Sequence, residues 1–192
     1  AAVTLAAPRG ASLDAAWAAL NAALRDEGLL LGWRDEAYAV RASAQGATLA
    51  FTYQGEALGR RVRPLAESVG ASLLLPCDVE QPASVDAAFA TIAEKWGSLD
   101  FLVHAIAFSD KTQLKGRYAD TTRDNFVRTM IISCFSFTEV AKRAATLMPA
   151  GGAMVTLTYN GGQRAMPNYN VMGVAKAALE ASVRYLAVDF GP

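Results

Sequence analysis

Short apolar runs alternate with helical patterns from Ala47 to the end of the sequence, and this alternation is the feature that most constrains the fold. Each run is almost continuously apolar, as expected of strands that are buried on both faces of a parallel sheet. The predicted strands are Thr48–Tyr53, Ser72–Leu75, Phe101–Ile106 and Ala153–Tyr159. The predicted helices are Glu56–Val69, Pro82–Trp96, Thr122–Met148 and Asn168–Phe190. We therefore expect an α/β fold with a doubly wound parallel sheet covered by helices.

The first 46 residues have a different texture, and we treat 1–46 as an atypical N-terminal segment and 47–192 as the main domain. Ala2–Ala6 is a candidate strand, and Ser12 is suited to cap an amphipathic helix that ends at Gly28. A strand, a loop containing Gly10 and a helix form the outline of a phosphate-binding turn. Dinucleotide-binding turns use three glycines, so an ordinary amphipathic helix remains the alternative.

Composition narrows the classes of function. The chain is 53% hydrophobic and 19% charged, and its 18 Lys and Arg balance its 18 Asp and Glu. This excludes a disordered chain and gives no basic surface for nucleic acid or membranes. No apolar run is long enough to span a bilayer, and no secretory signal is visible at the start.

The cysteines and the histidine suggest a location and argue against a metal site. Cys77 and Cys134 lie far apart, each in an apolar run, as buried thiols of a reducing compartment do. We therefore expect a cytoplasmic protein. A single histidine, His104, with no cluster of Cys or His around it, predicts no metal site.

The pair Tyr169 and Lys176 is the strongest local candidate for chemistry. Seven residues are about two helical turns, so both side chains would leave one face of a helix about 10 Å apart along its axis. A ligand along that face would touch both, and the ammonium would lower the pKa of the phenol. The alternative is an ordinary amphipathic helix with an exposed lysine and a half-buried tyrosine.

Other candidate residues follow the predicted strands. Ligands of open α/β sheets bind outside the carboxyl ends of the strands, which is where Tyr159 lies. The ends of the other strands carry Gln54, Asp78, Val79 and Ile106, followed by Ser109. Gln54 replaces the acidic residue with which dinucleotide folds read the ribose, which leaves the choice between NAD and NADP open.

Several segments together resemble bacterial enoyl-acyl-carrier-protein reductases of the short-chain dehydrogenase superfamily. The resemblance covers residues from about 47 to 192 and rests on Leu49–Gly55, Cys77–Val79, Asp100–Ile106, Leu157–Tyr159 and Met166–Lys176. The usual superfamily pattern places lysine four residues after tyrosine, where this chain has Gly173. Six residues between Tyr169 and Lys176 are typical of the enoyl reductase branch.

The resemblance implies a Rossmann-like fold and NADH-dependent reduction of the trans-2 double bond of an enoyl thioester on acyl carrier protein in fatty-acid synthesis. NADPH is the less favoured cofactor. By the same resemblance Tyr169 hydrogen-bonds the thioester oxygen, Tyr159 is a second active-site tyrosine, and Lys176 holds the nicotinamide ribose. The implied cofactor contacts are Gln54, Asp78, Val79, Ile106 and Lys176. The implied substrate contacts are Ser109, Tyr159 and Tyr169.

The sequence departs from the family at both ends. Relatives begin with a βα unit that binds pyrophosphate, and residues 1–46 replace it; within them Gly28–Val40 resembles the N-terminal segment of Nudix-type hydrolases, without the Nudix catalytic box. Since the family's first strand lies between the Ala47 and Phe101 strands, we expect Ala2–Ala6 to fill that place. Relatives also continue past Gly191 into a strand and a loop that covers the substrate.

Two readings of function follow. The first is an active reductase that forms a homo-oligomer, a tetramer or a dimer. The second is an inactive truncated or chimeric fragment that acts only in binding or self-association.

Overall fold

The computed structural model describes residues 2–5 and 46–191, which form two compact units. The first unit contains residues 1–105 and 143–155, and the second contains residues 106–142 and 156–192. The predicted helix that begins at Ser12 and the loop at Gly10 lie outside the described residues. Of the residues next to the predicted boundary, the structure describes Gly46 but not those directly before it.

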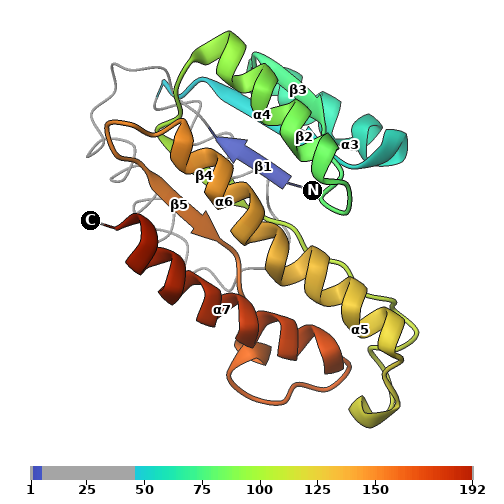
Figure 1. Ribbon diagram of the computed structural model, residues 1–192. Coiled ribbons are helices and arrows are strands. Elements are labelled where there is room, and N and C mark those ends of the chain that lie inside the picture. Colours follow the sequence, from blue (N-terminus) through green and yellow to red (C-terminus); the bar gives the residue numbers. More distant parts are fainter. Residues whose placement is uncertain (1, 6–45, 192) are drawn as a thin grey trace. The chain divides into compact units, whose positions relative to one another are not determined.

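Within its described residues, the first unit is built on five short strands (Figure 1). β2 (Leu49–Tyr53) pairs in parallel with β3 (Leu73–Pro76), as predicted, and β4 (Phe101–His104) pairs with β5 (Ala153–Thr156). β4 and β5 end earlier than predicted, so the backbone leaves the sheet before Ile106 and Tyr159. Both residues therefore lie in the segments that follow the carboxyl ends of these strands.

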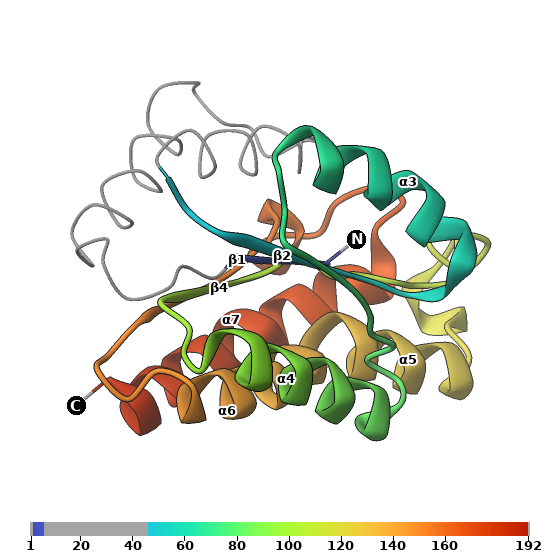
Figure 2. The same cartoon turned by 90° about the horizontal axis from the view of Figure 1, so that it is seen from above.

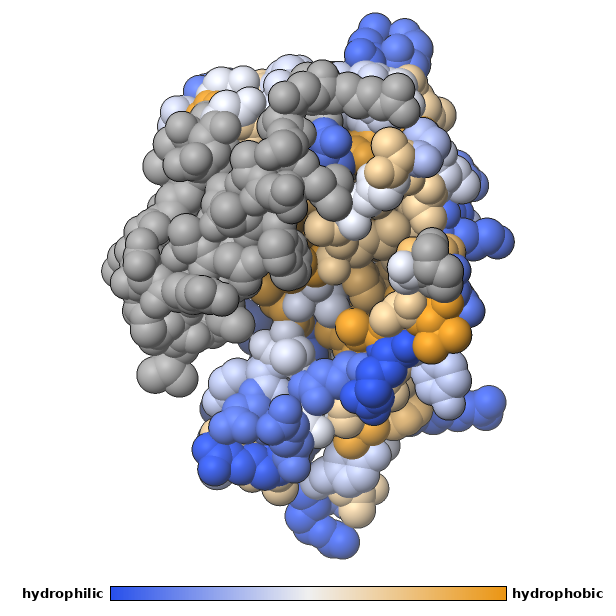
Figure 3. Space-filling model, turned by 90° about the vertical axis from the view of Figure 1, so that its left-hand side faces the viewer, coloured by the Kyte–Doolittle hydropathy of each residue, from blue (hydrophilic) through white to orange (hydrophobic). Residues whose placement is uncertain are grey.

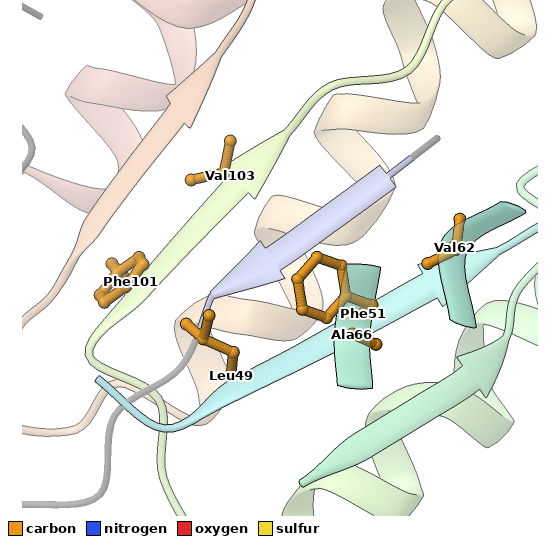
Figure 4. Close-up of a cluster of buried hydrophobic side chains, with 6 residues drawn as sticks. All are labelled: Leu49, Phe51, Val62, Ala66, Phe101 and Val103. Atoms are coloured by element: carbon orange, nitrogen blue, oxygen red, sulfur yellow. The ribbon is translucent and has the colours of Figure 1, made fainter. Parts of the chain in front are cut away.

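β1 (Ala2–Leu5) confirms the predicted N-terminal strand but not its direction. It runs between β2 and β4, the place that we expected it to fill (Figure 4). It is antiparallel to β2, with Ala2 opposite Thr52 and Leu5 opposite Leu49, so the prediction of an all-parallel sheet is wrong for this strand. Parallel and antiparallel ladders use the same backbone groups, and a short apolar run carries no information about which of them forms.

Two helices cover opposite faces of this sheet, as a doubly wound fold requires. α3 (Gly55–Ser68) lies above the strands in Figure 2, and α4 (Pro82–Trp96) lies below them. α4 matches the predicted helix because Pro82 stands in its first turn and Gly97, with φ of 73°, ends it in the left-handed conformation. The core beneath α3 consists of Leu49, Phe51, Val62, Ala66, Phe101 and Val103 (Figure 4).

The second unit contains most of the predicted long helix, and the structure corrects that prediction. In place of one helix over 122–148 there are α5 (Arg123–Met130), a π-helical turn η2 (Ile131–Phe135) and α6 (Ser136–Thr146). Thr122 caps α5 by accepting a hydrogen bond from the Asn125 main chain. A π turn inserts one extra residue, which amphipathic periodicity over so long a stretch does not reveal, and such turns are frequent at functional sites.

The last helix begins two residues later than predicted. α7 (Asn170–Phe190) follows the short 3₁₀ turn η3 (Asn160–Gly162), and Tyr169 is its N-cap rather than part of its first turn. The residues on either side of Tyr169 have positive φ, 59° at Asn168 and 32° at Asn170. The idea that Tyr169 and Lys176 project from one helical face is therefore wrong, because Tyr169 precedes the helix.

The face shown in Figure 3 mixes hydrophilic and apolar side chains, and both cysteines lie inside the protein. Figure 3 shows hydrophilic side chains in several separate patches on the face that it presents, with apolar ones between them. Cys77 and Cys134 are buried free cysteines, as predicted. Among the described residues, no helix is both long enough and apolar enough to cross a membrane.

Candidate active site

Two tyrosines meet at the start of α7 in the second unit. Tyr159 precedes η3 in extended conformation and Tyr169 caps α7. Their ring centroids are 4.8 Å apart, and the ring planes meet at 61°. This edge-to-face contact is the favoured geometry of aromatic pairs. Tyr159 is 40% exposed, whereas Tyr169 is half-buried, so the pair presents two phenols at one place.

Two glycines make room for the Tyr169 ring. A Cβ at Gly161 would clash with Tyr169 Cδ1 and would lie 3.2 Å from Tyr159 Cδ1. A Cβ at Gly173 would lie 2.6 Å from the main-chain oxygen of Gly161, so α7 packs directly on the η3 backbone. Gly173 stands where the ordinary superfamily pattern has lysine, and the structure gives the reason why no side chain fits there.

Burial keeps the Tyr169 phenol protonated. Burial, together with the smaller effect of the nearby Tyr159 phenol, raises the pKa of Tyr169 to about 12. We expected the Lys176 ammonium to lower this pKa, and that expectation is wrong. At neutral pH Tyr169 is therefore a hydrogen-bond donor, which suits it to stabilise an oxygen that becomes negatively charged.

Lys176 lies inside the second unit rather than on its surface. Its side chain is 5% exposed, and Nζ donates a hydrogen bond of 2.7 Å to the main-chain oxygen of Leu157, two residues before Tyr159. Burial lowers the pKa of Lys176. An ammonium has three donors, so this bond leaves others for a ligand hydroxyl. The exposed lysine of an ordinary amphipathic helix is thereby excluded.

The segment after β4 is fixed to α5 and η2 by polar side chains. Ser109 is 8% exposed; its hydroxyl donates to Asn125 Oδ1 at 3.3 Å and accepts from Thr129 Oγ1 at 2.9 Å. Ser133, in the π turn, donates to the Phe108 main-chain oxygen and accepts from the Phe108 main-chain nitrogen. The Ser109 hydroxyl is thus turned inward, and the exposed group of this segment is the Phe108 ring, over which Arg128 lies 4.5 Å from the centroid.

The candidate nucleotide residues of the first unit stand at the ends of two neighbouring strands. Gln54 follows β2, and Asp78 and Val79 come shortly after β3. Gln54 Nε2 lies 3.5 Å from Asp78 Oδ2, at the limit of a hydrogen bond, while Asp78 Oδ1 accepts from the Glu80 main chain at 3.0 Å. Val79 is buried. The exposed Gln54 amide and the partly buried Asp78 carboxylate beside a parallel strand pair fit the hydroxyls and amine of an adenosine.

The structure brings the predicted residues together in two groups. Gln54, Asp78 and Val79 belong to the first unit; Tyr159, Tyr169 and Lys176 form one cluster in the second, where Ile106 and Ser109 also lie. Among the described residues, no three His, Cys, Asp or Glu side chains are grouped as a metal site would need.

Three residues of the site were missed from the sequence: Gly161, Asn170 and Ser133. The asparagines on both sides of Tyr169 were the available signal, since Asn is enriched at positive φ.

Comparison with known proteins places these residues in a family. The family model described as "Enoyl-(Acyl carrier protein) reductase" matches residues 36–192. The chain belongs to the enoyl-acyl-carrier-protein reductase family. An NADH enoyl-acyl-carrier-protein reductase of Rhizobium meliloti is 74% identical over 149 residues, which are 78% of this chain and 56% of that protein. A family member from Rickettsia bellii is 56% identical over 155 residues, 81% of this chain and 59% of that protein.

Solved structures of the enoyl reductase family share the fold. The reductase of Anaplasma phagocytophilum in complex with NAD has a TM-score of 0.78 at 56% identity, over 82% of this chain and 61% of that one. The Aquifex aeolicus reductase also has a TM-score of 0.78, at 42% identity, over 81% of this chain and 63% of that one. The Rossmann-like α/β fold predicted for the chain is confirmed, and the chain spans a little over half the length of these family members.

Proposed function

We propose that this chain is an NADH-dependent enoyl-acyl-carrier-protein reductase that reduces the trans-2 double bond of an enoyl thioester in fatty-acid synthesis. The observation that carries the proposal is the cluster of Tyr159, Tyr169 and buried Lys176 at the start of α7, in a chain of this family. Relatives at up to 74% identity are named NADH reductases, which favours NADH over NADPH.

In this proposal each residue of the cluster has a separate task. When bound, reduced nicotinamide would supply a hydride to C3 of the enoyl group; negative charge would develop on the thioester oxygen, and a proton taken up from solvent at C2 would complete the reduction. The protonated Tyr169 hydroxyl donates a hydrogen bond to that oxygen, because its high pKa keeps the proton in place. Tyr159, the more exposed phenol, contacts the acyl group beside it. Ser109 contributes its main chain, since its hydroxyl is used internally.

The remaining candidates would hold the cofactor. Lys176 donates to the nicotinamide ribose with the protons that the Leu157 carbonyl leaves free. In the first unit Gln54, Asp78 and Val79 would contact the adenosine, and in the second unit Ile106 would be a further cofactor contact. The Gln54 amide and the Asp78 carboxylate suit the hydroxyls and the amine of adenosine.

The test of the proposed function is oxidation of NADH by the purified chain with a short trans-2-enoyl thioester. Lys176→Ala removes a charged donor to the ribose, so we expect the KM for NADH to rise about tenfold or more. Lys142→Ala, an exposed lysine of α6, serves as the matched control and keeps the rate. A folded chain that does not oxidise NADH, or a rate that Lys176→Ala leaves unchanged, contradicts the proposal and favours an inactive fragment.

We further propose that the chain acts in the cytoplasm on acyl carrier protein, and that it forms a homo-oligomer. Two buried free thiols suit a reducing compartment. Exposed apolar side chains are concentrated on the helices of the second unit. Those on α5 and η2 are Phe126, Val127, Ile131 and Phe135, and those on α7 are Val174, Val183, Tyr185, Val188 and Phe190.

Replacing the two most exposed of these residues tests the oligomer. Tyr185 is 77% exposed and Val188 is 74% exposed. We expect Tyr185→Ser together with Val188→Ser to reduce the mass measured by sedimentation from a dimer or tetramer to a monomer, because a hydrophobic interface loses much of its buried area. Arg184→Ser is the control on the same helix. An unchanged mass in the double variant contradicts this role for α7.

A further inference from the structure

Tyr169 is held in place by its backbone and by ring packing. Within the part of the chain that the structure describes, no hydrogen bond holds its hydroxyl, which leaves that group available to a substrate. The backbone around it is strained, since both neighbours have positive φ. Such a conformation is unfavourable for a residue other than glycine, and it persists only where the surroundings enforce it.

On one side of Tyr169, the Asn170 side chain holds the backbone in this conformation. Its Nδ2 faces three main-chain carbonyls of one loop and donates to Gln113 O at 3.2 Å, with Gly116 O at 3.4 Å and Lys115 O at 3.5 Å. Asn168, on the other side of Tyr169, is exposed and makes no hydrogen bond with the described residues through its side chain. Both asparagines have positive φ, but of the two only Asn170 is anchored to other described residues by its side chain.

The loop that receives Asn170 is itself well ordered by hydrogen bonds. Gln113 Oε1 accepts from the Thr122 main chain at 2.9 Å and from the Thr122 hydroxyl at 3.1 Å. Asp110 Oδ1 accepts from the Thr112 main chain and hydroxyl, and the Asp110 main chain donates to Asn125 Oδ1 at 3.0 Å. The loop therefore continues rigidly from the segment of Ile106 and Ser109 to the amide of Asn170.

We propose that Asn170 is a positioning residue that fixes Tyr169 for the reaction by tying the start of α7 to the loop 113–116. The inference rests on the proposed function, in which Tyr169 touches the substrate. Displacement of a reacting group by about 1 Å reduces rates by up to a hundredfold. The anchor acts on Tyr169 through the backbone, so it affects turnover and leaves the cofactor contacts in place.

Two matched glycine variants distinguish the effect of the Asn170 hydrogen bonds from the effect of the positive φ angles. Asn170→Gly removes the amide while favouring positive φ, and Asn168→Gly favours positive φ without removing an anchor. We expect kcat to fall about tenfold in Asn170→Gly, with the KM for NADH unchanged, and both constants to stay at the wild-type values in Asn168→Gly. Asn170→Asp, which keeps the size but loses both donors, should behave like Asn170→Gly. Unchanged kcat in both Asn170 variants overturns the proposal.

A second readout does not depend on activity. The chain is labelled with 3-fluorotyrosine, and the Tyr169 resonance is assigned by its loss in Tyr169→Phe. The shift of this resonance between H₂O and D₂O reports how exposed the ring is. We expect it to grow in Asn170→Gly and Asn170→Asp but not in Asn168→Gly. If the wild-type chain does not oxidise NADH, the proposed function fails, and an unchanged isotope shift in the Asn170 variants would separately overturn the positioning role.

Discussion

Tyr169→Phe is expected to lower kcat about 100- to 1,000-fold while the KM for NADH stays within a factor of about two. The phenol of Tyr169 is the protonated donor of the cluster, and removal of one donor to a developing oxyanion costs a rate factor of this size. Phenylalanine keeps the ring against Gly161 and Tyr159, so the fold is retained. Stopped-flow measurement of NADH oxidation at saturating thioester checks the change.

The comparison for this variant is Tyr159→Phe, because we expect the hydroxyl of the more exposed Tyr159 to contribute less to kcat.

The pH dependence of the rate provides a further check. With a pKa of about 12, Tyr169 stays protonated, so the wild-type rate should show no loss from its ionisation between about pH 7 and about pH 10. An unchanged kcat in Tyr169→Phe, or an alkaline loss near pH 8 that this variant abolishes, would contradict the assigned role.

Gly161→Ala is expected to reduce kcat about a hundredfold through displacement of Tyr169. The added methyl would clash with Tyr169 Cδ1 and would lie 2.7 Å from Cε1, closer than real side chains approach, so the ring must move. Gly161 does not have positive φ, so alanine brings no backbone strain of its own. Overpacking of this kind lowers the free energy of unfolding by about 1–3 kcal/mol. Steady-state kinetics and chemical denaturation measure the two effects.

Gln163→Ala, at the exposed end of the same 3₁₀ turn, is the matched control and should change neither quantity by much. Wild-type kcat in Gly161→Ala would mean that Tyr169 is mobile enough to make room, and that close packing of η3 against α7 does not set its position. A loss of stability with unchanged kcat in the folded fraction would lead to the same conclusion.

The sequence by itself determined the order and type of the elements from Ala47 onward. The apolar runs of β2 and β4 predicted buried strands, and the helix predicted over Pro82–Trp96 has the bounds of α4. The resemblance to the enoyl reductase family, with its six residues between Tyr169 and Lys176, identified Tyr159, Tyr169 and Lys176 as candidate site residues, which the spacing alone left open. These features are local, since burial, propensity and capping act over a few neighbouring residues.

Tertiary structure alone decided the direction of β1, the π turn and the environment of each candidate group. An apolar run of four residues is compatible with either strand direction, and the π turn, in which Ser133 hydrogen-bonds the Phe108 backbone, has no mark in the apolar pattern. The pKa of Tyr169 depends on burial and on Tyr159, and Lys176 reaches a carbonyl that lies 19 positions away in the sequence. The close packing at Gly161 and Gly173 and the hydrogen bonds of Asn170 also join separate segments of the chain, so no local pattern encodes them.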